Sequence, residues 1–164
     1  MILRRFSLVL VIVFSAITAC ASADQSTAVE RRAVLKALDS WKQGWKKKDA
    51  TLAVADYAED ADWTNAFGDR FKNRADLLKG LEFIFNLDFV MAGNSSDDGY
   101  QEVTFLTNNV ALVRSQVLRK GQLTGTGQTM RDREINHLRV LHKNDGRWLI
   151  VSHLISQAKE KGSR

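Results

Sequence analysis

The 164-residue sequence contains no proline and a single cysteine, Cys20. The absence of proline argues against proline-rich linkers and polyproline recognition segments, and one thiol cannot form an intramolecular disulfide or a cysteine-based zinc site. The chain length is that of one domain. Hydrophobic residues make up 45% and charged residues 26%, as in soluble globular proteins. The sequence therefore predicts one compact domain.

The N-terminus has the pattern of a secretory signal peptide. Arg4 and Arg5 give it a basic start, an apolar run follows over residues 6–17, and small neutral residues come next. The run is too short to cross a hydrocarbon core of about 30 Å. We interpret residues 1–23 as a signal peptide and residues 24–164 as a single domain.

Two cleavage sites compete within this segment. Residues 17–20, Ile-Thr-Ala-Cys, resemble a bacterial lipobox, in which the cysteine is lipidated and becomes the first residue of the mature protein. Residues 21–23, Ala-Ser-Ala, would instead release a soluble chain that begins at Asp24. We favour lipidation of Cys20, because the only cysteine stands where a lipobox requires it. The expected location is the periplasm or the outer membrane of a bacterium, with membrane contact only through the lipid.

The charge balance argues against nucleic acid as a partner. Either cleavage removes Arg4 and Arg5, which leaves 22 lysines and arginines against 19 acidic residues. So small an excess of positive charge does not predict nucleic-acid binding.

Helical patterns dominate the first half of the mature chain. Val34, Leu38, Trp41 and Trp45 are spaced by four, three and four residues and share one face of a helix. Thr27, followed three residues later by glutamate, predicts a capping box at the start of this helix.

Further elements follow this helix. Asp49 predicts the cap of a short helix that reaches Tyr57, and residues 61–67 alternate as a strand does. A third helix is expected from Arg74, with its buried stripe at Leu77, Leu81, Ile84 and Phe85.

The second half consists of strand patterns. Residues 101–106, 110–119, 129–142 and 147–157 are rich in valine, isoleucine, leucine and threonine, and asparagine- or glycine-containing turns separate neighbouring segments. Helices followed by antiparallel strands predict an α+β fold with the helices on one face of a curved sheet. The glycines at 121, 125 and 127 do not open a helix, so a dinucleotide or phosphate loop is not expected.

Two segments carry a family resemblance. Residues 57–68, Tyr-Ala-Glu-Asp-Ala-Asp-Trp-Thr-Asn-Ala-Phe-Gly, resemble the helix-to-strand junction of the NTF2-like superfamily, with its SnoaL-like and DUF4440 members and the SgcJ/EcaC group as the nearest. Residues 139–156 are similar to that group's last hairpin. The resemblance implies a cone: a curved antiparallel sheet wrapped around three N-terminal helices, with a pocket at the wide end and a homodimer as the expected assembly.

Ketosteroid isomerases of this superfamily offer a test for catalysis. The resemblance matches their general base to Asn65, their oxyanion-hole tyrosine to Trp41 and their protonated aspartate to Leu138. An amide cannot abstract a proton from carbon and leucine donates no hydrogen bond, so this match excludes the isomerase mechanism. A slip of one residue on the late strand would turn His137 inward. The ungapped match is preferred because it also places Val151, His153 and Ile155 inward.

The implied pocket would be lined by aromatic side chains with a few polar anchors. Aromatic residues at these spacings are also ordinary core residues, but several indole N–H groups need partners that a pocket with a ligand would supply. The expected lining residues are Trp41, Trp45, Tyr57, Trp63, Asn65, Phe67, Leu138, Val151 and His153, with Phe83 as a further candidate.

His153 is the candidate catalytic residue, because it interrupts an otherwise apolar strand and an imidazole can act as acid or base near neutral pH. The alternative is a neutral core histidine that is bonded to Asn65 or Tyr57. His137 and His142 are expected at the surface or in a dimer interface. No residues have metal-ligand spacing, and Ser152 and Ser156 lack the partners of a nucleophile, so we expect neither a metal nor another cofactor.

Three functions remain open. The preferred one is an exported domain that binds a small apolar or aromatic molecule in its cone. The second is an enzyme of unknown reaction with His153 as acid or base, and the third is a non-catalytic homodimer.

The lipobox interpretation predicts incorporation of palmitate. When the full chain is expressed in a Gram-negative host with labelled palmitate, we expect label in the parent protein and none in Cys20→Ser. Secretion of an unlabelled parent chain would show that the site at residues 21–23 is used instead.

Overall fold

The structure, a computed structural model, describes residues 25–96 and 99–157. The predicted signal peptide with Cys20, the Asp97–Asp98 pair and the C-terminal residues 158–164 lie outside the described residues.

Seven strands form one curved sheet with the order β2-β1-β7-β6-β5-β3, and β4 pairs with the other half of β5. Their bounds are β1 Tyr57–Thr64, β2 Arg70–Phe71, β3 Asn94–Ser96, β4 Gln101–Thr107, β5 Val110–Lys120, β6 Arg133–Asn144 and β7 Arg147–Gln157. The predicted antiparallel arrangement holds except between β1 and β7, which run parallel. The sheet is therefore mixed, because the chain returns beside its first strand in the same direction.

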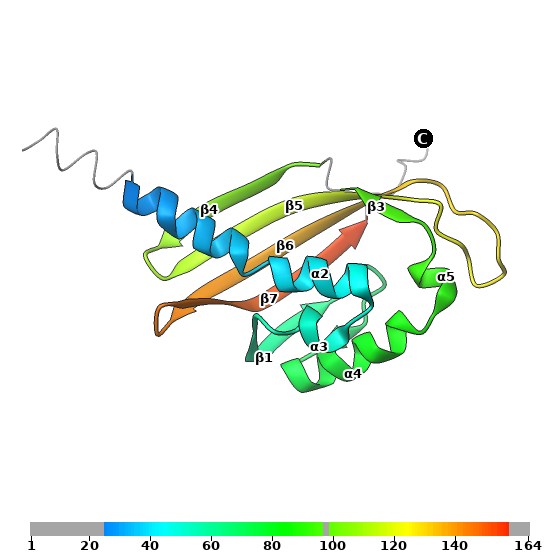
Figure 1. Ribbon diagram of the computed structural model, residues 1–164, viewed down its shortest axis with the longest axis horizontal. Coiled ribbons are helices and arrows are strands. Elements are labelled where there is room, and N and C mark those ends of the chain that lie inside the picture. The colour runs from blue at the N-terminus through cyan, green and yellow to red at the C-terminus, as the bar shows by residue number, and fades with distance from the viewer. Residues whose placement is uncertain (1–24, 97–98, 158–164) are drawn as a thin grey trace, which may run out of the picture.

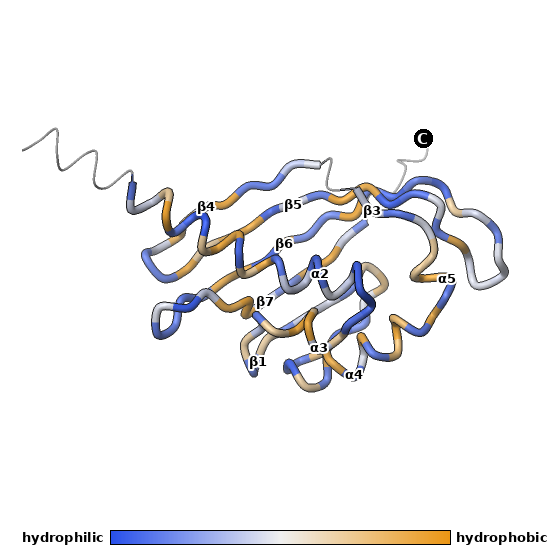
Figure 2. The backbone as a smooth tube through the Cα atoms, in the orientation of Figure 1, coloured by the Kyte–Doolittle hydropathy of each residue, from blue (hydrophilic) through white to orange (hydrophobic). Residues whose placement is uncertain are grey.

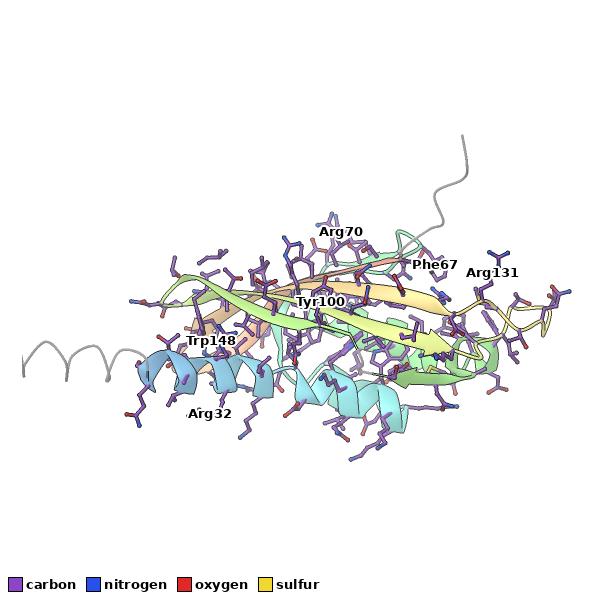
Figure 3. All side chains as sticks on the ribbon, turned by 90° about the horizontal axis from the view of Figure 1, so that it is seen from above. Arg32, Phe67, Arg70, Tyr100, Arg131 and Trp148 are labelled. Atoms are coloured by element: carbon purple, nitrogen blue, oxygen red, sulfur yellow. The ribbon has the colours of Figure 1, made fainter. Side chains whose placement is uncertain are left out.

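The helices cover one face of this sheet (Figure 1). Besides a first helix over residues 25–36, they are α2 Asp39–Lys47, α3 Ala50–Ala53, α4 Arg74–Phe85 and α5 Asp88–Met91. Figure 3 shows the first helix and α2 on one side of the strands. The hydropathy pattern alternates along β5, β6 and β7 (Figure 2), as expected for strands with one face against a core. No helix among the described residues is long and apolar enough to cross a membrane.

The predicted cap at Asp49 is confirmed, whereas the predicted ends of two helices are wrong. The Asp49 side chain accepts a hydrogen bond from the Leu52 amide at 2.9 Å, as a helix cap does. The helix that it caps ends at Ala53, because Tyr57 already begins β1. The first helix is already formed at residue 25, so Thr27 is not its cap.

Glu30 has a role other than the predicted capping box. Its carboxylate accepts hydrogen bonds from Lys143 Nζ at 2.6 Å and Trp148 Nε1 at 2.8 Å. These bonds lower the pKa of Glu30 and attach the first helix to the β6–β7 hairpin.

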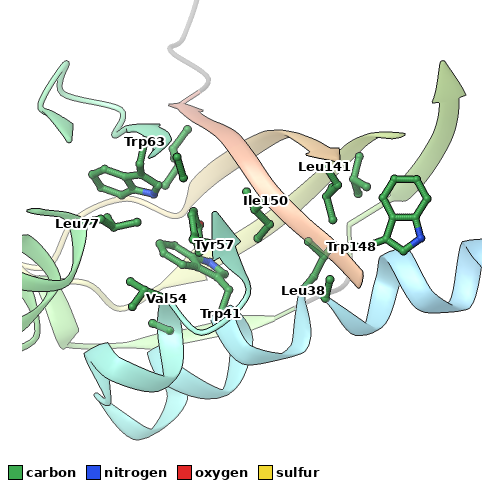
Figure 4. Close-up of a cluster of buried hydrophobic side chains, with 14 of the residues drawn as sticks. Leu38, Trp41, Val54, Tyr57, Trp63, Leu77, Leu141, Trp148 and Ile150 are labelled. Carbon is green, nitrogen blue, oxygen red and sulfur yellow. The ribbon is translucent and has the colours of Figure 1, made fainter. Parts of the chain in front are cut away.

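The core lies between the helices and the inner face of the sheet (Figure 4). Gly44 in α2 permits close packing, since a Cβ there would lie 2.5 Å from the backbone of Ala53. Leu38 and Trp41 of the predicted helical stripe are buried, and Trp45 is half-buried. Large side chains from the helices and from β1, β6 and β7 meet here: Leu38, Trp41, Val54, Tyr57, Trp63, Leu77, Leu141, Trp148 and Ile150.

Candidate functional site

A cluster of buried polar side chains interrupts the apolar core on the inner face of the sheet. Tyr57 comes from β1, Ser115 from β5, His137 and Arg139 from β6, and His153 from β7. All five are buried. The strand register brings them together, because Ser115 lies opposite His137 and Arg139 lies opposite His153.

Three of these side chains form a continuous chain of hydrogen bonds. The Tyr57 hydroxyl lies 2.5 Å from Nδ1 of His153, and Nε2 of His153 lies 2.9 Å from Nδ1 of His137. Both ring nitrogens of His153 are therefore occupied. We refer to Tyr57, His153 and His137 as the relay chain.

Arg139 lies beside the relay chain. Its Nη1 donates a hydrogen bond to Ser115 Oγ at 3.1 Å, and its guanidinium also hydrogen-bonds to Tyr57. Burial and then the positive charge of Arg139 hold the pKa of both histidines well below 6.5, so both imidazoles are neutral at pH 7. Burial raises the pKa of Tyr57 despite Arg139, so the phenol is also neutral.

These charge states assign the direction of the hydrogen bonds. The guanidinium can only donate, so the Tyr57 oxygen accepts from Arg139 and its O–H donates to Nδ1 of His153. His153 then carries its proton on Nε2 and donates to Nδ1 of His137. The proton of His137 must be on Nε2. The relay chain thus ends in an N–H donor.

The two ends of the relay chain differ in accessibility. Tyr57 is 0% exposed, whereas His137 is 9% exposed. Nε2 of His137 makes no hydrogen bond to any residue that the structure describes. Nε2–H of His137 is therefore the donor of the chain whose hydrogen bond is not used among the described residues.

Aromatic side chains surround His153. The ring centroid of Trp41 lies 4.9 Å from that of His153 and the centroid of Trp63 lies 6.4 Å from it, both in edge contacts. The buried Nε1 atoms of Trp63 and Trp45 have no hydrogen-bond partner in the structure. That a ligand supplies partners for such indole N–H groups stays a prediction.

The expected open pocket is not found at the relay chain. Two surface hollows stand out in the described part of the molecule. One lies at the α3–α4 junction, around residues 48–51 and 82–86, and the other lies beside β2, around residues 70–72 and 76–80. Neither is lined by the relay chain, because aromatic side chains fill the space there.

Four predicted lining residues come together and two on the β1 side do not. Trp41, Tyr57, Trp63 and His153 form one cluster. Asn65 lies beyond the end of β1, where its side chain binds the Asp69 side chain and the backbone amides of Phe67 and Asp69. Phe67 is 79% exposed. The prediction for Asn65 and Phe67 is wrong because β1 ends at Thr64, before its alternation can reach them.

Leu138 and Val151 are also misplaced by the sequence prediction. His137 and Arg139 face inward on β6, so Leu138 lies on the outer face, half-buried. Val151 is half-buried at the irregularity between Ile150 and Ser152, beyond which His153 and Ile155 face inward as expected. The expectation that His137 lies at the surface is wrong by this one-residue slip.

The remaining predicted residues lie at the edge of the cluster or outside it. Trp45 is half-buried and packs against Trp41 and Phe85. Phe83 is exposed, as is His142. Sequence reasoning missed Arg139 and Ser115, although the alternation that turns His137 inward also turns Arg139 inward.

Comparisons with known proteins support the fold. No protein-family model matches the sequence, and no curated protein is significantly similar to it. Solved structures do match. A hexachlorocyclohexane dehydrochlorinase from Novosphingobium barchaimii has a TM-score of 0.69 at 16% identity, over 83% of this chain and 91% of that one.

Two further structures define the class. A ketosteroid isomerase-like protein from Erwinia carotovora has a TM-score of 0.60 at 14% identity, over 78% of this chain and 95% of that one. An NTF-2-like protein of unknown function from Shewanella oneidensis has a TM-score of 0.60 at 15% identity, over 77% and 98%. The chain therefore has the NTF2-like α+β fold, as predicted; at these identities the likeness shows the fold alone.

The neutral histidines predict a pH dependence of stability. Their pKa values in the folded protein lie below 6.5, the ordinary value, so the unfolded chain binds more protons once the pH falls below about 6.5. The free energy of unfolding should therefore decrease as the pH is lowered below about 6.5, by about 1.4 kcal/mol per pH unit for each histidine that stays neutral in the folded protein.

Urea unfolding between about pH 6.5 and pH 5 measures this slope. We expect a shallower slope in His137→Gln and the parent slope in His142→Gln, which changes an exposed histidine. Equal slopes in the parent and His137→Gln would contradict the assigned protonation state.

Proposed function

We propose that this protein is an exported NTF2-like domain that binds a small, largely apolar or aromatic molecule at the His137 end of the relay chain. The observation that carries the proposal is the N–H donor of His137 at the end of a buried chain of hydrogen bonds, which has no acceptor among the described residues. A core without a ligand gains little from such a network, because each buried polar group must be satisfied.

The contact residue in this proposal is His137 and not His153. Both ring nitrogens of His153 are bonded within the protein and its ring is buried. His153 therefore positions His137 and fixes its tautomer. A neutral imidazole that presents Nε2–H binds a hydrogen-bond acceptor, such as a carbonyl oxygen.

The surroundings of His137 support an apolar body for the ligand. Ile155 lies opposite His137 on β7, and the next pair of β5 and β6 residues on the same face toward the end of the sheet is Val117 with Ile135. Trp41, Tyr57 and Trp63 fill the space on the other side. We therefore place the ligand on the side of Val117 and Ile135, where binding requires small movements of apolar side chains.

Acid–base catalysis is the second candidate function, and the continuity of the relay chain favours it. In such a reaction His137 gives its Nε2 proton to the ligand, takes a proton from His153, and His153 takes the proton of Tyr57. The remaining phenolate is stabilised by Arg139. The raised pKa of Tyr57 opposes this last step, so the arrangement favours holding a ligand over transferring a proton.

Export, a lipid at Cys20 and a homodimer complete the proposal. Export and lipidation derive from the N-terminal sequence. Among the described residues no helix covers the outer face of the sheet, which carries apolar side chains, including Leu138, Val140 and the exposed Leu154, that would suit a dimer contact. A purely structural homodimer is the outcome if no small molecule binds.

Binding is testable with aromatic ketones as probes, because Trp41 and Trp63 report on the site by fluorescence. We expect saturable quenching by at least one compound of a panel, and affinity about tenfold weaker in His137→Ala, since one hydrogen bond is lost. His142→Ala is the matched control and should bind as the parent does.

The possible outcomes separate the candidate functions. Equal affinity in His137→Ala and the parent, or no binding by any probe, would overturn the proposal. Turnover of a bound ketone by the parent, absent in a folded His137→Ala, would establish the second candidate function.

A further inference from the structure

Two arginines face each other at the end of the sheet. Arg119 near the end of β5 lies directly opposite Arg133 at the start of β6. Both belong to the inner face, on which His137 follows Arg133 by four residues. Like charges directly opposite one another destabilise a strand pair, and burial adds to the cost. Such a pair therefore needs a compensating interaction.

Within residues 25–96 and 99–157, Arg119 is bound only by neutral groups. Its Nη2 donates to the carbonyl oxygens of Val90 at 2.5 Å and Ala92 at 3.1 Å, and its Nη1 donates to Ser95 Oγ at 3.3 Å. Its Nε is buried and has no hydrogen-bond partner in the structure. Burial, and then the charge of Arg133, lower the pKa of Arg119.

Arg133 is held in the same way and is only 8% exposed. Its Nη1 donates to Gln122 Oε1 at 2.5 Å, and its Nε donates to Gln157 Oε1 at 2.9 Å, an oxygen that also accepts from Nη2. Gln122 in turn donates to the carbonyl of Val90, which also accepts from Arg119. The two guanidinium groups thus share one network.

No carboxylate of the described residues pairs with either arginine. Elsewhere the chain does supply such partners, as Asp62 for Arg70 and Asp56 for Arg147. Each guanidinium has five N–H groups and uses three in the bonds above. Donors and positive charge therefore remain for a ligand.

We propose that Arg119 and Arg133 form a binding site for the oxyanion of a small organic molecule, a carboxylate or phosphate group. Planar guanidinium groups match such oxyanions geometrically, and an anion between them would offset their repulsion. The centroid of the exposed Phe67 ring lies 5.8 Å from Cζ of Arg133, and the ring offers an apolar surface to the organic part. The site does not depend on ligand binding at His137.

The competing explanation is structural. Arg119 attaches the α5 segment to the sheet through Val90 and Ala92, and Arg133 attaches the end of β7 through Gln157. A purely structural role predicts loss of stability on substitution, without any specific effect of anions.

Thermal unfolding at low ionic strength distinguishes the two explanations. The probes are inorganic phosphate, acetate and benzoate, each up to about 10 mM, with Tm as the readout. We expect a saturable rise in the parent Tm of about 3 °C or more, largest with benzoate if Phe67 contacts the organic part. Phosphate as the strongest probe would assign the site to phosphate groups.

Two variants complete the design. Arg119→Gln should lose the anion-dependent rise, whereas Arg114→Gln, which changes an exposed arginine of the same strand, should keep it. Any rise in Tm that salts cause in general should be the same in both variants, so the difference between their Tm shifts reports specific anion binding. If Arg119→Gln does not fold, Arg133→Lys and calorimetric titration of the parent with benzoate replace it.

Three results would overturn the proposal. These are no saturable Tm rise in the parent, no benzoate binding by calorimetry, or an equal anion effect in Arg119→Gln and Arg114→Gln.

Discussion

The interior of this domain depends on a hydrogen-bonded chain that leaves no choice of proton position. In a buried chain of a phenol and two neutral imidazoles, each hydrogen bond must join one donor to one acceptor. Arg139 sets the direction of these hydrogen bonds, because a guanidinium donates hydrogen bonds and never accepts them. From it follow the hydroxyl direction of Tyr57, the tautomer of His153 and finally the N–H that His137 presents.

The curved sheet makes this chain possible. Antiparallel pairing of β5, β6 and β7 sets Ser115 opposite His137 and Arg139 opposite His153, while the parallel neighbour β1 supplies Tyr57. The inner face therefore carries alternating rows: the arginine pair at the end of the sheet, the apolar Val117–Ile135 pair, then the polar cluster. Apolar walls with a few polar anchors are the usual composition of small-molecule sites.

Much of the fold could be predicted because its signals are local. The spacing of Leu38, Trp41 and Trp45, the cap at Asp49 and the turn at residues 144–146 each depend on neighbouring residues. Cross-strand direction is not local, so the parallel pairing of β1 with β7 was not predictable from the same patterns.

The site was predictable only in part, for a related reason. Alternation along a strand identifies two faces but not which one is inside, and a shift of one residue exchanges them. The strand pattern places His153 correctly on the inner face, whereas it points Leu138 inward where the structure has His137 and Arg139. The predicted inward position of Asn65 is wrong because β1 ends at Thr64, just before it. Whether side chains fill the space beside Trp41 and Trp63 or leave a pocket depends on their volumes, which the spacing of residues in the sequence does not reveal.

The protonation state of the two histidines tests the central claim most directly. Two-bond proton–nitrogen correlation spectra at neutral pH report the tautomer of each imidazole, and assignment follows from the spectra of His137→Gln and His142→Gln. We expect His153 and His137 to be neutral, with their protons on Nε2. A proton on Nδ1 of His153, or a charged imidazolium at either position, would contradict it.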